Sequence, residues 1–222
     1  MGSEQAVRAW ADFFKTGGRA GCRDAAAVAS MPPADPVVRS TVFPHFLAAL
    51  GTRDAPAILD LGPVVGANIA FFGERLACKI HVEDVVADIE DHARRGKRQA
   101  LPAFLASRIR QPAGSIDGVL CWDTFDFLDP AAGRVLAFSL TRVLKSGGVL
   151  HGSFGTTAVD LRQYTRTVVE SASVLRPRRY PATPVPRTVR LTRDMIKMFD
   201  GLVVTESVLL KSGTRETLFR KP

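Results

Sequence analysis

The chain has 222 residues, a length that one α/β domain can fill, so we expect a single domain over residues 1–222. Hydrophobic residues make up 46% of it and charged residues 23%, which excludes a disordered, collagen-like or coiled-coil chain. No stretch approaches the roughly 18 uninterrupted apolar residues of a membrane helix, and the N-terminus lacks a secretory pattern. Three widely spaced cysteines predict no disulfide framework, and the four histidines lack metal-ligand spacing. We therefore predict a cytoplasmic protein without membrane contact or a metal site.

The positive charge of the chain is concentrated in two windows. Thirty basic and 22 acidic residues give a formal net charge of +8. Residues 92–116 hold six basic residues and no acid, and residues 171–193 hold six more, again without an acid. Two interpretations are open. The windows are either solvated loops, or they meet on one face that would attract an anionic or phosphate-bearing partner.

The first 155 residues divide into a helical lead-in and a series of alternating strands and helices. Apolar residues at helical spacing predict helices at 4–15, 23–30 and 37–50. From Pro56 onward, short apolar runs predict strands at 57–61, 79–83, 118–122 and 148–154, and helical patterns predict helices at 68–76, 85–95 and 131–144. Strands that are apolar on both faces and separated by helices indicate a parallel sheet covered on both sides.

The pattern changes again after Gly155. Residues 164–175 are partly β-like, and residues 176–190 hold four prolines among several arginines, which predicts a long ordered loop or a lid. A short helix is predicted from Thr192. Two β-like runs at 202–210 and 214–220 flank Lys-Ser-Gly and predict a closing antiparallel hairpin.

A glycine turn follows the strand predicted at 57–61. The run Ile-Leu-Asp-Leu-Gly-Pro-Val-Val-Gly-Ala-Asn, residues 58–68, leads from this strand into the next predicted helix. In an open parallel sheet, ligands bind beyond the carboxyl ends of the strands, which is where this turn lies. Asp60 precedes the turn, and Gly62 and Gly66 permit the close approach of a ligand to the backbone.

This run resembles the first motif of the class I S-adenosylmethionine-dependent methyltransferases, which consists of an apolar strand, an acid and a Gly-x-Gly-x-Gly turn. Gly62 and Gly66 match the outer glycines. The sequence departs from the family at Val64, which stands in place of the middle glycine, and at Pro63, which has no backbone N–H. A β-branched side chain resists the close approach and the positive φ that glycine permits. The resemblance implies a cofactor site, and these departures leave open whether it is reshaped or lost.

An acidic pair, Glu83 and Asp84, ends the second predicted strand. In the family that the chain resembles, an acid at this position accepts hydrogen bonds from the two ribose hydroxyls, and a carboxylate can accept two such donors at once. Glu83 follows Gly62 by 21 positions. The same spacing is found in dinucleotide-binding dehydrogenases, and a solvated acid at a strand end is a further alternative.

Further elements of the same family follow in order. Residues 115–123 resemble its fourth strand, and residues 142–150 resemble its helix, Gly-Gly turn and fifth strand. The hairpin predicted at 202–220 matches its last two strands. Trp122 and Asp123 end the fourth strand. There Trp122 would stack on the adenine or pack in the core, and Asp123 would contact the cofactor, act as a general base or cap a helix.

The resemblance implies a Rossmann-like, doubly wound, mostly parallel sheet with a C-terminal antiparallel hairpin. No strand is evident between Asp91 and Asp117, where the family has its third. The predicted parts are a helical N-terminal extension over 1–50, a cofactor-binding core over 56–155, an arginine- and proline-rich loop or lid over 156–191, and a closing helix and hairpin over 192–222. The residues predicted to bind S-adenosylmethionine are Asp60, Gly62, Pro63, Gly66, Glu83, Asp84, Trp122 and Asp123.

Three functions are compatible with these patterns. The first is S-adenosylmethionine-dependent methyl transfer to an unidentified acceptor, either an anionic small molecule or a nucleic acid, with no catalytic residue singled out. The second is a methyltransferase-like binding or assembly subunit that has lost catalysis and contacts RNA or an acidic partner, which Val64 and the missing third strand favour. The third, a nicotinamide-dependent oxidoreductase, leaves the closing hairpin and the Gly-Gly turn unexplained. The sequence does not determine the oligomeric state.

Overall fold

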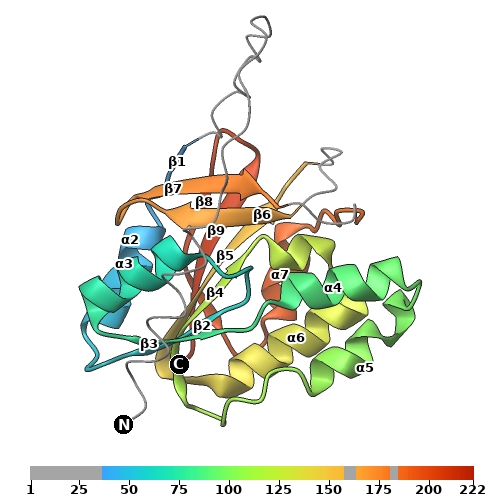
Figure 1. Ribbon diagram of the computed structural model, residues 1–222, viewed down its shortest axis with the longest axis horizontal. Coiled ribbons are helices and arrows are strands. Elements are labelled where there is room, and N and C mark those ends of the chain that lie inside the picture. The colour runs from blue at the N-terminus through green and yellow to red at the C-terminus, as the bar shows by residue number, and fades with distance from the viewer. Residues whose placement is uncertain (1–36, 158–163, 181–184) are drawn as a thin grey trace, which may run out of the picture. The chain divides into compact units, whose positions relative to one another are not determined.

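The structure is a computed structural model that describes residues 37–157, 164–180 and 185–222 (Figure 1). The helices predicted at 4–15 and 23–30 lie outside the described residues. The third predicted helix is shorter than expected, because strand β1 (Val38–Arg39) precedes helix α2 (Phe43–Gly51).

A six-stranded sheet forms the centre of the described chain, with the strand order β3-β2-β4-β5-β9-β8. Its strands are β2 (Ala57–Asp60), β3 (Lys79–Val82), β4 (Ile116–Trp122), β5 (Leu144–Gly155), β8 (Val203–Leu209) and β9 (Thr214–Arg220). The first four are parallel, and β9 runs antiparallel to both β5 and β8. The predicted mostly parallel sheet with a C-terminal hairpin is therefore confirmed.

Helices cover both faces of this sheet (Figure 1). They are α3 (Gly66–Leu76), α4 (Val85–Arg94), α5 (Leu101–Ala106), α6 (Pro130–Val143) and α7 (Thr192–Met198), with 3-10 turns η1 (Arg98–Ala100) and η2 (Thr124–Phe127). Successive strand residues point to opposite faces. Ile58 and Leu120 pack with α2 and α3, whereas Leu59 and Val119 pack with α4, α5, α6 and α7. The strands are apolar on both faces for this reason.

The interval between α4 and β4 contains η1 and α5 and no strand, and all of its residues are described. The missing third strand is therefore a feature of the fold. Within the described part of the chain, no helix is long and apolar enough to cross a membrane. The same residues contain no cluster of three or more potential metal ligands.

A second, three-stranded sheet replaces part of the predicted loop at 156–191. Strands β6 (Thr165–Val169) and β7 (Val174–Arg179) pair antiparallel, and β1 pairs with the start of β7. The expected loop over 176–190 is thus wrong for Arg176–Arg179. Proline and arginine suggested a loop, but among the described residues β1 pairs with β7 only at Val174 and Leu175, so within this part of the chain β7 is an edge strand at Pro177. Proline is tolerated at such positions.

Asn68 joins this small sheet to helix α3. Its side-chain Nδ2 donates to the Thr167 carbonyl at 2.8 Å, and its Oδ1 accepts from the Val169 N–H at 2.8 Å. The Asn68 side chain is only 3% exposed. The amide therefore bonds the free edge of β6 much as a further strand would.

We predict that Asn68→Ala lowers the free energy of unfolding by about 2–4 kcal/mol, because it leaves a buried N–H and a buried carbonyl without partners. Amide exchange of Val169 should also become faster. Urea unfolding and hydrogen exchange measure both effects. Glu74→Ala, an exposed change on the same helix, is the control and should alter stability by less than about 0.5 kcal/mol. Equal stability of both variants would show that Asn68 does not anchor the small sheet.

His151 lies in the middle of β5 without a hydrogen bond to either ring nitrogen. It is fully buried, and the rings of Phe43, Phe46 and Trp122 surround it at centroid distances of 5.5, 6.1 and 6.2 Å. Burial lowers the pKa of His151 from 6.5 to about 4. The folded protein therefore disfavours the charged imidazole that the unfolded chain readily forms.

We predict that the contribution of His151 to stability falls as the pH drops from about 6.5 to 4, because the unfolded chain then binds a proton that folded His151 does not. His151→Leu should remove this part of the pH dependence and raise stability at pH 7 by about 1 kcal/mol or more, since it deletes two unpaired polar atoms. Chemical unfolding of both proteins across this pH range checks the prediction. Parallel pH profiles would contradict it.

Candidate functional site

The glycine turn between β2 and α3 is fixed by Asp60, the last residue of β2. Its Oδ1 accepts from the Gly62 N–H at 2.9 Å and from Trp122 Nε1 at 2.7 Å. A Cβ on Gly62 would lie 2.7 Å from Cδ1 of Trp122, so only glycine leaves room for the indole. Burial raises the pKa of Asp60 to about 6, although both hydrogen bonds oppose this. The first glycine of the motif thus serves to pack Trp122.

The departure at Val64 does not close the turn. The Val64 side chain is 56% exposed, and its backbone is not in the positive-φ region. A Cβ on Gly66 would meet nothing within 4 Å, so the end of the turn is open. Pro63 is buried. Val64 thus occupies its place in the turn without a positive φ, and it lines the cavity that faces the turn.

The acids at the end of β3 already have partners. Glu83 accepts from Arg108 through Oε2 and from Gln111 Nε2 at 2.7 Å through Oε1. Arg108 also donates to Asp88 at 2.7 Å. Asp84 is the N-cap of α4 and accepts from the Ala87 N–H at 3.0 Å, and burial raises its pKa. Each Glu83 oxygen has a second lone pair, so its capacity to accept hydrogen bonds is not exhausted.

Asp123 is a buried acid with one free oxygen. It follows Trp122, whose φ of +47° is a left-handed conformation that turns the chain at the end of β4. Asp123 is 8% exposed, and its Oδ2 accepts from the Thr165 N–H at 3.2 Å. Its Oδ1 is fully buried and has no hydrogen-bond partner among the described residues. Burial, together with the nearby charge of Asp126, raises the pKa of Asp123 to about 7.

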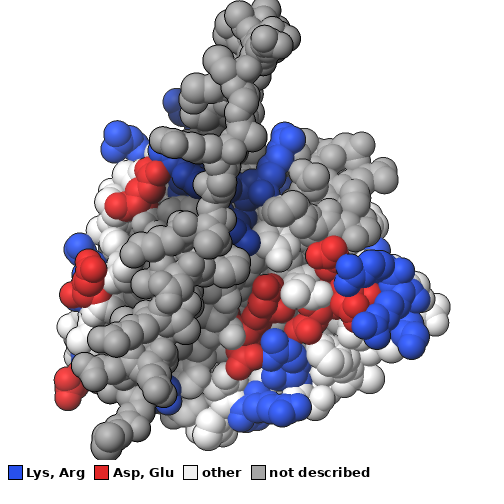
Figure 2. Space-filling view, in the orientation of Figure 1, with Lys and Arg blue, Asp and Glu red and all other residues white. Residues whose placement is uncertain are grey.

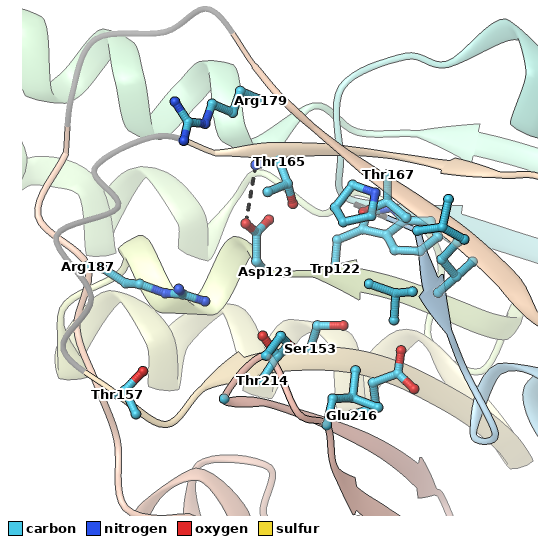
Figure 3. A pocket seen from close by; sticks show the side chains of 17 residues that line it. Trp122, Asp123, Ser153, Thr157, Thr165, Thr167, Arg179, Arg187, Thr214 and Glu216 are labelled. Carbon is cyan, nitrogen blue, oxygen red and sulfur yellow. Dashed lines mark hydrogen bonds between the residues drawn. The ribbon is translucent and has the colours of Figure 1, made fainter. Parts of the chain in front are cut away.

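Asp123 lines a cavity of about 390 Å³, which we name the β4–β5 cavity because it lies at the carboxyl ends of these strands. Its other side chains come from the small sheet, from β5 and β9, and from the segments beside them (Figure 3). The polar and charged residues of its lining include Ser153, Thr157, Thr165, Thr167, Arg179, Arg187, Thr214 and Glu216. Small-molecule sites span roughly 300–1,000 Å³, so this cavity is of that size.

A second cavity, of about 400 Å³, faces the glycine turn. Val64, Val65, Gly66 and Ala67 form one wall, and Arg166, Val168, Arg178 and Arg179 form the other. Because side chains alternate along a strand, Thr165 and Thr167 of β6 face the β4–β5 cavity while Arg166 and Val168 face the glycine turn. The small sheet therefore contributes side chains to both cavities, and Arg179 lines both of them.

The arginines of the two basic windows do not form one free basic surface. Arg108 pairs with Glu83 and Asp88, and Arg187 pairs with the buried Asp126. Further internal partners are Asp91 for Arg94 and Arg95, Glu170 for Arg176, and the main-chain carbonyls of Phe125 and Leu128 for Arg190. On the face shown in Figure 2, acidic side chains lie among the basic ones.

The predicted cofactor residues thus gather at one edge of the sheet but have different surroundings. Trp122 and Asp123 line the β4–β5 cavity, and Gly66 lines the cavity at the glycine turn. The others, Asp60, Gly62, Pro63, Glu83 and Asp84, line neither. Sequence reasoning missed Arg179 and Glu216 of the cavity wall. Strand alternation in the predicted hairpin could have placed Glu216 inward, but no signal identified Arg179.

No family model and no curated protein matches the sequence, but solved structures do. An S-adenosylmethionine-dependent methyltransferase from Mesorhizobium loti has a TM-score of 0.52 at 14% identity, over 80% of this chain and 96% of that one. The PH0226 protein from Pyrococcus horikoshii OT3 has a TM-score of 0.51 at 15% identity, over 79% of this chain and 86% of that one. The [4+2]-cyclase SpnF has a TM-score of 0.50 at 14% identity, over 82% of this chain and 81% of that one. The likeness is one of fold, and it confirms the class I methyltransferase fold that the motifs indicated.

We predict that two aspartates titrate far above the usual range, Asp60 near pH 6 and Asp123 near pH 7, because both carboxyls are buried. Both pKa values lie above that of the unfolded chain, so these groups lower stability as the pH rises from about 4 to 7. Carboxyl ¹³C NMR with Asp60→Asn and Asp123→Asn as assignment variants measures them. Titration midpoints below pH 5 would show that these two carboxyl groups are not buried as the structure has them.

Proposed function

We propose that the protein is an S-adenosylmethionine-dependent methyltransferase whose acceptor binds in the β4–β5 cavity. The observation that carries this proposal is Asp123, a buried carboxyl whose residue lines the cavity at the end of β4. It directly follows Trp122, which packs on the glycine turn. A proton acceptor in the cavity is thus next to the part of the fold that would hold the cofactor.

The residues at the glycine turn and at the end of β3 fit this cofactor. Gly66 opens onto unfilled space, and the exposed Val64 side chain leaves the backbone of the turn accessible. Glu83 retains lone pairs for ribose hydroxyls beside its bonds to Arg108 and Gln111. Gly62, Gly66 and Glu83 would hold the cofactor, and Asp84 would act by capping α4. When bound, the cofactor supplies an electrophilic methyl group.

Asp123 would take the proton that a hydroxyl or amino acceptor loses as it attacks. A general base works best when its pKa is near the working pH, and that of Asp123 is raised to about 7. The Thr165 N–H donates to Oδ2 at 3.2 Å and so holds the carboxyl group of Asp123 at the cavity wall. The remaining role of the cavity is to orient the acceptor, because methyl transfer depends mainly on alignment.

The alternative of a subunit that contacts RNA or an acidic partner receives no support from the charge distribution. It rested on a convergence of the two basic windows, on the departure at Val64 and on the missing third strand. The described interval between α4 and β4 contains no strand, but Arg108, Arg176 and Arg187 are engaged within the chain. A location in the cytoplasm stays a prediction.

We predict that Glu83→Ala weakens binding of S-adenosylhomocysteine by about tenfold or more, since it removes the acceptor for the ribose. Isothermal titration calorimetry measures the change. The matched control is Asp88→Asn, which disturbs the same Arg108 but lies on α4, away from the strand end. We expect the control to stay within about twofold of the original protein.

Two results would contradict this prediction. The first is an equal loss in both variants, which would mean that Glu83 acts only by positioning Arg108. The second is the absence of binding to the unaltered protein at millimolar ligand, which would remove the cofactor from the proposal altogether. A ligand that binds only the folded state must also raise the melting temperature, so thermal unfolding gives an independent reading.

A further inference from the structure

We propose that the β4–β5 cavity selects a small, flat acceptor with one anionic group and, at its other end, a hydroxyl or amino group. Arg179 would bind the anionic group, and Asp123 would accept a hydrogen bond from the hydroxyl or amine. The role of this ligand as a methyl acceptor rests on the proposed function. Its binding in the cavity does not depend on that function.

Arg179 is the cation of the cavity that is available to a ligand. Two arginines belong to the described lining, Arg179 and Arg187. Arg187 donates to Asp126 through Nε, at 2.6 Å, and through a second nitrogen, so its charge is balanced within the fold. Arg179 has no acidic partner among the described residues. A guanidinium presents paired donors that match a carboxylate, so a ligand carboxylate would supply the missing anion.

The positions of Arg179 and Asp123 are linked through one residue. Thr165 lies opposite Arg179 in the β6–β7 register, and the Thr165 N–H bonds to Asp123. Residues directly opposite in an antiparallel pair place their side chains on the same face, here the face toward the cavity. No ion pair joins Arg179 to Asp123 itself. In Figure 3 the two side chains lie on either side of Thr165, and both residues line the cavity.

Glu216 limits the ligand to a single anionic group. It is 1% exposed, and its Oε2 accepts from the Ser40 hydroxyl at 2.6 Å. Figure 3 shows Glu216 on the side of the cavity away from Arg179 and Arg187. A second negative group at that end would meet a buried acid. The cavity is thus unsuited to the repeated phosphates of a nucleic acid, which is the other acceptor class that the sequence left open.

The apolar part of the cavity lining favours a flat hydrocarbon. Trp122, Val38, Leu175 and Pro177 belong to this lining, and the total volume of the cavity is about 390 Å³. Aromatic rings bury much apolar area at little entropic cost and pack well against an indole. A benzene ring with a carboxylate and a hydroxyl at opposite ends meets all of these requirements. We therefore choose 4-hydroxybenzoate as the probe.

The test compares three ligands that differ by one group each, by isothermal titration calorimetry with the full chain. 4-Hydroxybenzoate carries both groups, 4-hydroxybenzamide lacks the charge, and benzoate lacks the hydroxyl. We expect 4-hydroxybenzoate to bind about tenfold or more tightly than 4-hydroxybenzamide, as the loss of a charge-assisted hydrogen bond implies. Arg179→Gln should reduce this preference to about twofold or less. Asp123→Asn should instead reduce the preference for 4-hydroxybenzoate over benzoate.

Arg178→Gln is the matched control. Arg178 is the neighbour of Arg179 on β7 and is also exposed, but it lines only the glycine-turn cavity, whereas Arg179 lines both cavities. It should keep the full preference for the carboxylate. Thermal unfolding of each variant checks that it is folded. Equal binding of acid and amide, no binding of any probe at millimolar concentration, or an equal effect of the two arginine substitutions would overturn the assignment.

Incubation with methyl-labelled S-adenosylmethionine separates this assignment from the proposed function. If 4-hydroxybenzoate binds with the predicted preference but neither it nor 4-aminobenzoate is methylated, the ligand class stands and the proposed function loses support. If neutral phenols or amines are methylated while their carboxylate-bearing counterparts are neither bound nor methylated, the function stands and the ligand class is wrong.

Discussion

The candidate site depends on the buried carboxyl of Asp60. This group joins the ends of two parallel strands, because it binds the first glycine of the turn after β2 and the indole of Trp122 at the end of β4. Trp122 in turn occupies the space that the missing side chain of Gly62 leaves. Its left-handed backbone directs the next residue, Asp123, to the cavity wall. One buried acid therefore sets both the shape of the glycine turn and the place of the proposed base.

The small sheet gives this site its second special feature. Asn68 anchors β6 to α3, and Thr165 bonds to Asp123, so the sheet is tied to both halves of the site. The sheet offers hydroxyls to the β4–β5 cavity and Arg166 and Arg178 to the glycine turn, and Arg179 lines both cavities. Buried hydrogen bonds at both attachments make the sheet a fixed wall rather than a loose loop.

Much of the main sheet could be predicted from the sequence, because the signals that mark its strands and helices lie within each element. Apolar runs such as 118–122, stop signals such as the glycines after residue 144, and helical spacing each mark an element where it stands. The small sheet could not be predicted in this way. Its strand β7 contains Pro177 and three arginines, and its formation depends on partners far along the chain, such as Val38 and Asn68.

The residues of the candidate site could likewise be predicted only in part from the sequence. The sequence indicated Glu83 and Asp123 from their positions at strand ends, and the structure places both at that edge. It gave no sign that Arg108 and Gln111, some 25 residues further on, would bind Glu83, or that Arg187 would neutralise Asp126. The number of basic residues in a stretch of sequence does not show which of them pair with acidic residues in the folded protein. For this reason the concentration of arginine suggested a nucleic-acid surface that the internal ion pairs do not support.

The central claim is that this fold holds S-adenosylmethionine between the glycine turn and Glu83. A crystal structure of the protein grown with saturating S-adenosylhomocysteine tests it most directly. The account predicts the ligand against the Gly62–Gly66 turn, with its ribose hydroxyls within hydrogen-bond distance of Glu83 and its sulfur facing the side on which Asp123 lies. A turn without ligand, with Glu83 still bonded to Arg108 and Gln111 alone, would contradict the account.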